Sequence, residues 1–146
     1  MAEDAPSRVS VWHSAPGRAL PNAAVTRLAE AVLKAEGVEY LYIGVVLSRR
    51  DEVHRMNREF LEHDYPTDVL SFRISDEGDA LEGEVYVDLD MAAERAPEFG
   101  TRFSHEAARY VVHGLLHLAG HDDARPEQRE HMRELENRYL ERFWPV

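Results

Sequence analysis

The sequence contains no cysteine, and this absence narrows the chemistry that the protein can use. Without thiols the chain can form no disulfide bond and no thiolate metal site. Any metal ion must therefore be held by histidine nitrogens or carboxylate oxygens. The 146 residues supply 8 histidines and 28 acidic residues for that purpose.

Long apolar runs are also missing. No stretch approaches the roughly 18 apolar residues that indicate a membrane-spanning helix. The first residues, Met1–Pro6, are acidic and lack an apolar segment, so we expect a loose tail rather than a signal peptide. We therefore expect a cytoplasmic protein with no membrane partner, folded as one domain over residues 1–146.

Lysine is nearly absent, because Lys34 is the only one among the 17 basic residues and all the others are arginine. The formal net charge at pH 7 is −11. This charge argues against a broad basic surface for non-specific binding of nucleic acid. It leaves room for a local groove in which arginine side chains contact phosphates.

Apolar periodicity predicts an α+β fold. Alternating or β-branched segments predict about four strands in one mixed sheet, and apolar residues at helical spacing predict four to five helices packed with it. The expected strands are 8–13, 40–47, 69–72 and 83–88, and the expected helices end near residues 36, 60, 99, 119 and 143. The helix that ends near residue 119 should pack centrally.

That central helix carries the clearest chemistry. His113 and His117 are four residues apart in an apolar run, so their side chains lie on one helix face and can reach one metal ion. Gly120 predicts the helix end, after which the chain can bring His121 or Asp123 to the same ion. Such a set, with a fourth position open to water, suits zinc. The alternative is a pair of half-buried histidines satisfied by hydrogen bonds.

The residue after the first histidine distinguishes two kinds of zinc site. Metzincin peptidases share the spacing of the two histidines and the following glycine, and they have a glutamate after the first histidine as general base. This chain has Gly114 there. The sequence therefore favours a metal site but not a zinc peptidase.

Other polar residues each have two interpretations. Glu106 lies about two helical turns before the first histidine. It could orient that ligand or simply stabilise the helix N-terminus. Asp64, Thr67, Asp68 and Ser71 could form a substrate wall near the metal, or a loop whose side chains satisfy backbone amides.

Together these motifs resemble the YbeY family, the bacterial endoribonucleases of rRNA maturation. The matching residues are Asn57, 64–72, 83–85, 113–123, Met132 and Glu136. The resemblance implies a zinc-dependent endoribonuclease, specific for single-stranded RNA, in maturation of the 16S rRNA 3′ end and in ribosome quality control. It also implies that the small ribosomal subunit and ribosomal proteins are partners. A GTPase is a further partner that an assembly factor would have.

By position, the resemblance implies that His113 and His117 are the first two ligands of one Zn2+ ion per chain. The family's third ligand is a histidine at the position of Asp123, so the register favours Asp123, with His121 as the alternative. The family also has an arginine implicated in activity where this chain has Leu61. RNA cleavage is therefore a less direct expectation than metal binding.

Several side chains are candidates for the catalytic roles. Arg58 and Arg73 could contact phosphate in place of the family's arginine, and His121, Asp122 and Asp68 are candidates for the general base. Attack on the phosphate by a water that the metal activates would leave 5′-phosphate ends. The main alternative is a ribosome-assembly factor that binds without turnover and uses zinc mainly for structure.

Overall fold

Four strands and five α-helices make up the part of the chain that the computed structural model describes, residues 7–14, 19–61, 68–75 and 80–144. In chain order the elements are β1 (Val9–His13), α1 (Asn22–Ala35), β2 (Tyr40–Ser48), α2 (Arg50–Leu61), β3 (Val69–Ser75), β4 (Leu81–Asp88), α3 (Leu89–Arg95), the 3₁₀ helix η2 (Pro97–Phe99), α4 (Phe103–Leu118) and α5 (Pro126–Phe143). The predicted α+β class is confirmed.

The four strands form one mixed sheet in the order β1-β2-β4-β3. Strands β1, β2 and β4 are parallel, and β3 runs antiparallel to β4. In the middle of the sheet, Val45 of β2 pairs with Val11 on one side and with Val85 on the other. Ser71 of β3 pairs with Val85 from the opposite side, so β3 forms one edge of the sheet.

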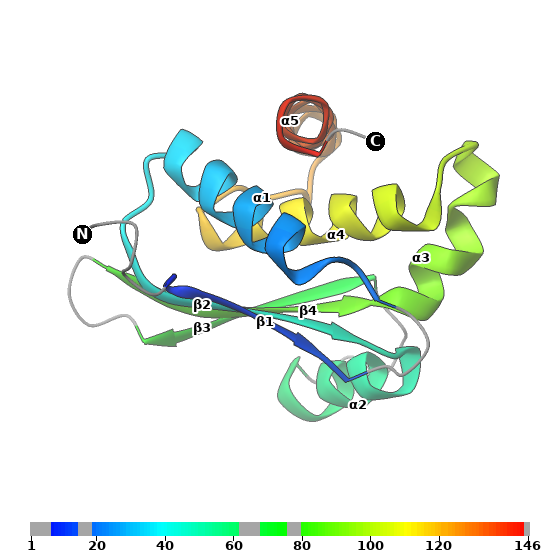
Figure 1. Cartoon of the computed structure of the whole chain (residues 1–146), viewed down its shortest axis with the longest axis horizontal. Helices are drawn as coiled ribbons and strands as arrows, with labels where there is room; N and C mark the ends of the chain where they lie inside the picture. Colours follow the sequence, from blue (N-terminus) through cyan, green and yellow to red (C-terminus); the bar gives the residue numbers. More distant parts are fainter. Residues whose placement is uncertain (1–6, 15–18, 62–67, 76–79, 145–146) are drawn as a thin grey trace.

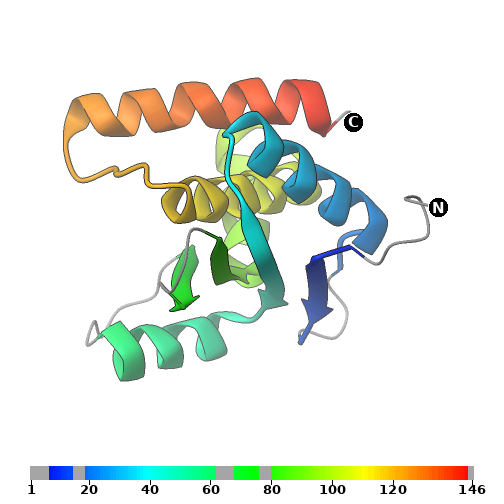
Figure 2. The ribbon, with the colours of Figure 1, turned by 90° about the vertical axis from the view of Figure 1, so that its left-hand side faces the viewer.

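The helices cover both faces of the sheet unequally. Helices α1 and α4 lie over one face, and α2 lies against the opposite face (Figure 1). Helix α5 packs outside α1 and α4, and it crosses over them in the view turned by 90° (Figure 2). In α4 the side chains of Ala107, Val111 and Leu115 are fully buried. The central position predicted for this helix is therefore confirmed.

The structure differs from the prediction where one helix was expected over residues 91–99. Helix α3 ends at Arg95, and η2 begins at Pro97. Proline has no backbone N–H to continue the α-helical hydrogen bonds, and its ring clashes with the preceding turn. Gly100, with a φ of 64°, then ends η2. This break turns Phe99 out of the register of α3.

Some expectations concern residues outside those that the structure describes. They are the tail at residues 1–6, the loop residues Asp64 and Thr67, and the side chain of Leu61. Within the described ranges, no helix combines the length and the apolar character that crossing a bilayer requires.

Candidate metal centre

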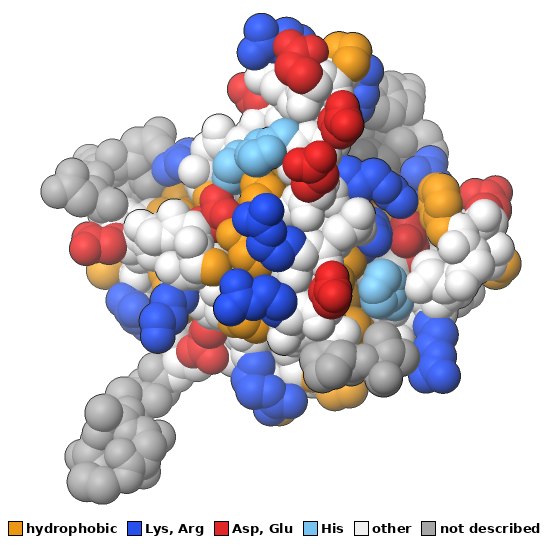
Figure 3. Space-filling model, turned by 90° about the horizontal axis from the view of Figure 1, so that it is seen from above, with side chains coloured by type: hydrophobic (Ala, Val, Ile, Leu, Met, Phe, Trp, Pro, Cys, Tyr) orange, Lys and Arg blue, Asp and Glu red, His pale blue; other side chains and the backbone are white. Residues whose placement is uncertain are grey.

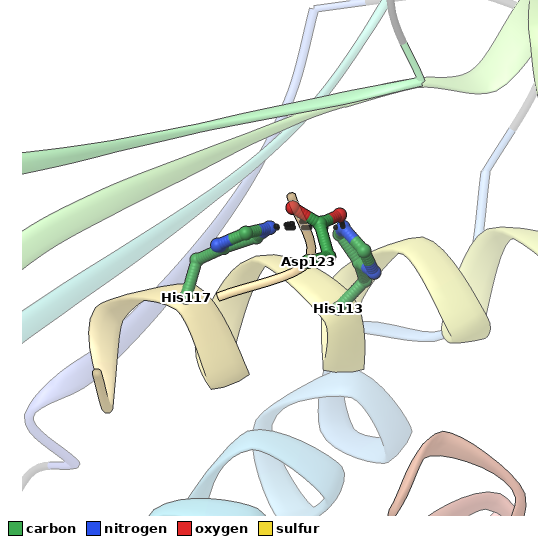
Figure 4. A group of neighbouring side chains, drawn as sticks. All are labelled: His113, His117 and Asp123. Atoms are coloured by element: carbon green, nitrogen blue, oxygen red, sulfur yellow. Dashed lines mark hydrogen bonds and ion pairs between the residues drawn. The ribbon is translucent and has the colours of Figure 1, made fainter. Parts of the chain in front are cut away.

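The end of α4 sets the position of the third candidate ligand. Gly120 has a φ of 106°, a conformation that favours glycine. The amide of His121 donates to the carbonyl of Leu116 at 3.0 Å, and the amide of Gly120 donates to that of His117 at 3.0 Å. These bonds close the last turn of the helix. The chain then reverses and brings Asp123 back beside the histidines (Figure 4).

Three side-chain atoms converge at this point. The Nε2 atoms of His113 and His117 lie 3.1 Å apart. The Oδ2 atom of Asp123 lies 3.2 Å from the first nitrogen and 3.4 Å from the second. A tetrahedral site with metal–ligand distances of about 2.0–2.1 Å separates its ligand atoms by about 3.3–3.4 Å. The group therefore has the spacing of three corners of a tetrahedron and could hold a metal ion.

Within the described part of the chain, this group is only partly buried. The side chains of His113, His117 and Asp123 are 20%, 28% and 37% exposed. Among the described residues, no fourth histidine or carboxylate joins them. Structural zinc sites are closed by four protein ligands, whereas catalytic sites leave one position for water or substrate. Three partly exposed residues are compatible with the second kind of site.

Glu136 of α5 orients one of the two histidines. Its Oε2 atom lies 2.7 Å from Nδ1 of His113. When Nδ1–H donates to this carboxylate, Nε2 keeps the lone pair that faces the other two candidate ligand atoms. Glu136 is only 5% exposed, and Nη1 of Arg109 lies 3.0 Å from its other oxygen. The ring of His113 is therefore held from a second helix.

The charges around His113 favour a cation. Burial alone lowers the pKa of this imidazole, but the hydrogen bond to Glu136 and the negative charges of Glu136, Asp68 and Asp123 outweigh burial and raise the pKa. An environment that stabilises an imidazolium also stabilises a metal ion at the same place.

Gly114 lies directly against the sheet. A Cβ atom there would be 2.4 Å from Cγ1 of Val85 and 3.0 Å from Cγ2 of Val69. The carbonyl of Gly114 also accepts a hydrogen bond from Oγ of Ser71 at 2.9 Å. The position after the first histidine therefore has no room for a glutamate and faces the sheet. This contact gives a physical reason against the peptidase interpretation.

A cleft between α4 and α5 opens onto the candidate metal centre. Its lining repeats at helical spacing, with Glu106, Arg109, Tyr110 and His113 on α4 and Arg129, Met132, Arg133 and Glu136 on α5. Arg95 and Phe99 line it as well, as do Asp68 and Asp123. Acidic and basic side chains are intermixed on the face that carries α5 (Figure 3). The cleft itself gathers four arginines and four carboxylates.

The two arginines that the sequence analysis proposed for phosphate lie elsewhere. Nη2 of Arg73 donates to the carbonyl of Leu118 at 2.9 Å, which ties β3 to the end of α4. Arg58 belongs to α2 on the opposite face of the sheet, where it lines a separate groove with Arg49 and Arg55. Neither Arg58 nor Arg73 lines the cleft of the candidate metal centre.

Of the three candidates for the general base, two lie outside the cleft. Nε2 of His121 lies 2.6 Å from Oε1 of Glu36, so its ring is engaged outside the group that contains Asp123. Asp122 is exposed and is not part of the cleft lining. Asp68 is the one candidate for the general base that lines the cleft.

Comparison with known proteins agrees with these observations. A family model described as Endoribonuclease YbeY matches residues 17–144. The chain belongs to this family. A protein of the same name from Salinibacter ruber is 45% identical, over 100% of this chain and 98% of the relative. Another, from Chlorobium phaeovibrioides, is 43% identical over 88% of this chain and 86% of the relative.

A solved structure supports the fold of this YbeY-family chain. The solution structure of a Thermotoga maritima protein matches with a TM-score of 0.64 and 31% identity. The match covers 93% of this chain and 89% of the other. The resemblance that the sequence motifs indicated is therefore confirmed at the level of family and fold.

Sequence reasoning missed the structural role of Glu136 and the arginines of the cleft. Glu136 was noted only as fitting the family's final helix, and Glu106 was considered for the role of orienting a histidine. Arg129, Met132, Arg133 and Glu136 lie at i, i+3, i+4 and i+7 on one face of α5. Charged residues occur all round this helix, so the spacing alone does not single out that face.

Proposed function

We propose that this chain is a zinc-dependent endoribonuclease that cleaves single-stranded RNA, and that it acts in the maturation of the 16S rRNA 3′ end. The observation that carries the proposal is the triangle of His113, His117 and Asp123 at a cleft that is lined by four arginines and four carboxylates. Membership of the YbeY family supports the RNA substrate. Family membership also supports a role in ribosome quality control, and we propose that the protein acts in the cytoplasm.

The donor set supports zinc as the metal. Two imidazole nitrogens and one carboxylate oxygen are ligands that zinc accepts, and their separations of 3.1, 3.2 and 3.4 Å suit its tetrahedral preference. His113, His117 and Asp123 would hold one Zn2+ ion per chain. When bound, zinc supplies a Lewis acid that polarises the phosphate and makes water a stronger nucleophile.

The protein's own side chains bind and orient the substrate. The guanidinium groups of Arg95, Arg129 and Arg133 offset the charge of phosphates in the cleft, and arginine suits bidentate contacts to phosphate oxygens. Glu136 keeps the ring of His113 in its orientation. We assign the proton acceptor to Asp68, since the other two candidates do not line the cleft.

An assembly factor with a mainly structural zinc is less well supported. A structural zinc calls for a closed site with four protein ligands, whereas this group has three, all partly exposed. The small ribosomal subunit, ribosomal proteins and a GTPase are the partners that we propose. Binding to them would fit either hypothesis, so turnover decides between the two.

The proposal is tested on small ribosomal subunits that carry unprocessed 16S rRNA 3′ ends. We expect the zinc-loaded protein to shorten these ends, and we expect a chelator or the substitution His113→Ala to abolish the shortening. Tight binding of the subunits without any shortening would instead favour the assembly factor. Hydrolysis of peptides in a parallel assay would favour the peptidase.

A further inference from the structure

Phe99 is an unusual residue in the cleft. Five large apolar side chains of the described chain are more than half exposed, namely Trp12, Leu41, Phe60, Ile74 and Phe99. Of these, Phe99 alone lines the same cleft as His113 and Asp123. The residue is 56% exposed, so part of its aromatic side chain is accessible to whatever occupies the cleft. Exposing apolar surface to water is unfavourable in free energy, and a ligand that covers the surface would remove this cost.

Backbone hydrogen bonds fix the chain around Phe99. The amide of Phe99 donates to the carbonyl of Ala96 at 3.2 Å, and the amide of Gly100 donates to that of Pro97 at 3.1 Å. The amide of Thr101 also donates to the carbonyl of Ala96, at 3.0 Å. The ring is therefore presented by a closed turn between α3 and α4.

An arginine from another helix lies over the same ring. The guanidinium carbon of Arg133 is 5.9 Å from the ring centroid of Phe99, and Arg133 is exposed on α5. Arg133 lies three residues before Glu136, the carboxylate that orients His113. The cleft that opens onto the candidate metal centre thus pairs a flat apolar ring with a planar cation.

We propose that Phe99 is a stacking platform for one nucleobase of the single-stranded RNA, and that Arg133 contacts the phosphate beside that base. This inference rests on the proposed function of the same cleft. Unpaired bases can splay out and stack on aromatic rings and on arginine, whereas bases inside a duplex already stack on their neighbours. The platform would therefore select single strands and position the strand at the metal.

The first test compares matched variants in a background that cannot cleave. In a His117→Ala background, the affinity for a short, labelled single-stranded RNA is measured by fluorescence anisotropy. We expect Phe99→Leu to weaken binding by about 5- to 150-fold, the range of one base–aromatic stack. Phe99→Trp should keep the affinity of the background protein. Phe60→Leu, the same change at a ring that is 63% exposed outside the cleft, should also keep it.

A second test locates the stacked base. A series of RNAs, each lacking one base, is measured with the background protein and with the Phe99→Leu variant. The background protein should lose affinity when one particular base is missing, and the variant should lose nothing further with that RNA. The variant should also lose the preference for single strands over a duplex.

The outcomes separate the platform from the proposed function. If the background protein binds RNA and wild type cleaves it, but Phe99→Leu binds equally well, the platform is wrong and the function stands. If Phe60→Leu weakens binding as much as Phe99→Leu, stacking in this cleft is likewise overturned. If the background protein does not bind RNA and wild type does not cleave it, both the proposed function and the platform fail.

Discussion

Nδ1 of His113 lies 2.7 Å from Oε2 of Glu136, a buried carboxylate that another helix contributes. We expect Glu136→Gln to weaken metal binding by about 10- to 100-fold, because the carboxylate fixes the tautomer and raises the basicity of the ligand. Competition with a chromophoric chelator measures this affinity. Glu134→Gln, an exposed change on the same helix, is the control. Equal affinities for wild type and Glu136→Gln would contradict the orienting role.

The identity of the third candidate ligand gives a second prediction. Asp123→Ala should reduce metal affinity by more than about 100-fold, because losing a ligand costs more than losing an outer partner. Asp122→Ala, one residue away and exposed, should leave affinity unchanged. The metal content per chain is measured for both variants after dialysis. If Asp123→Ala retains the metal and His121→Ala loses it, the third ligand is His121 and the assignment of Asp123 is wrong.

Gly114 gives a prediction about packing. In an uncrowded helix, replacing glycine with alanine stabilises the fold by about 1 kcal/mol. Here the new methyl group would lie 2.4 Å from Cγ1 of Val85, so we expect Gly114→Ala to destabilise the protein by about 1–3 kcal/mol instead. Urea unfolding measures whether the substitution lowers or raises the free energy of unfolding. A more stable variant would show that α4 and the sheet are not in close contact at this point.

Glu36 gives a prediction about pH. Burial raises the pKa of this carboxyl, but hydrogen bonds with Tyr139 and His121 and the positive charge of His121 outweigh burial and hold the pKa below its usual value. A carboxyl with a lowered folded-state pKa adds stability above its unfolded-state pKa, and that stability is lost as pH falls through the folded-state pKa.

We therefore expect Glu36→Gln to reduce the free energy of unfolding by about 1 kcal/mol at pH 7. The difference from wild type should shrink below about pH 4.5 and vanish once the carboxyl is protonated in both states. Urea unfolding across pH 3 to 7 measures it, with the exposed Glu39→Gln as control. A difference that stays constant over this range would show that the charge of Glu36 is not responsible.

The sequence could predict what depends on a single helix and the turn that follows it. The spacing of His113 and His117 fixes their common face, and Gly120 marks the end of the helix before any contact is known. The family register then selects Asp123. The break at Pro97 also has a local cause, the proline itself, although one helix that ends near residue 99 was expected.

The rest depends on how distant elements pack. Glu136 follows His113 by 23 residues, and no local spacing indicates that α5 crosses α4 at this point. Arg58 was considered because it is near the family motif in sequence. Helix α2, however, lies against the opposite face of the sheet, away from α4. Proximity along the chain therefore does not indicate which arginines line the cleft between α4 and α5, and neither Arg58 nor Arg73 is among them.

The most direct test of the account is cleavage of a labelled single-stranded RNA by the zinc-loaded protein. The account predicts cutting that a chelator stops, that zinc restores, and that His113→Ala and Asp123→Ala both lack. The products should carry 5′-phosphate ends, because water is the expected nucleophile. Products with 2′,3′-cyclic phosphate ends would overturn that choice of nucleophile. Equal cutting by wild type and both variants, or none by wild type with one zinc ion bound per chain, would contradict the central claim.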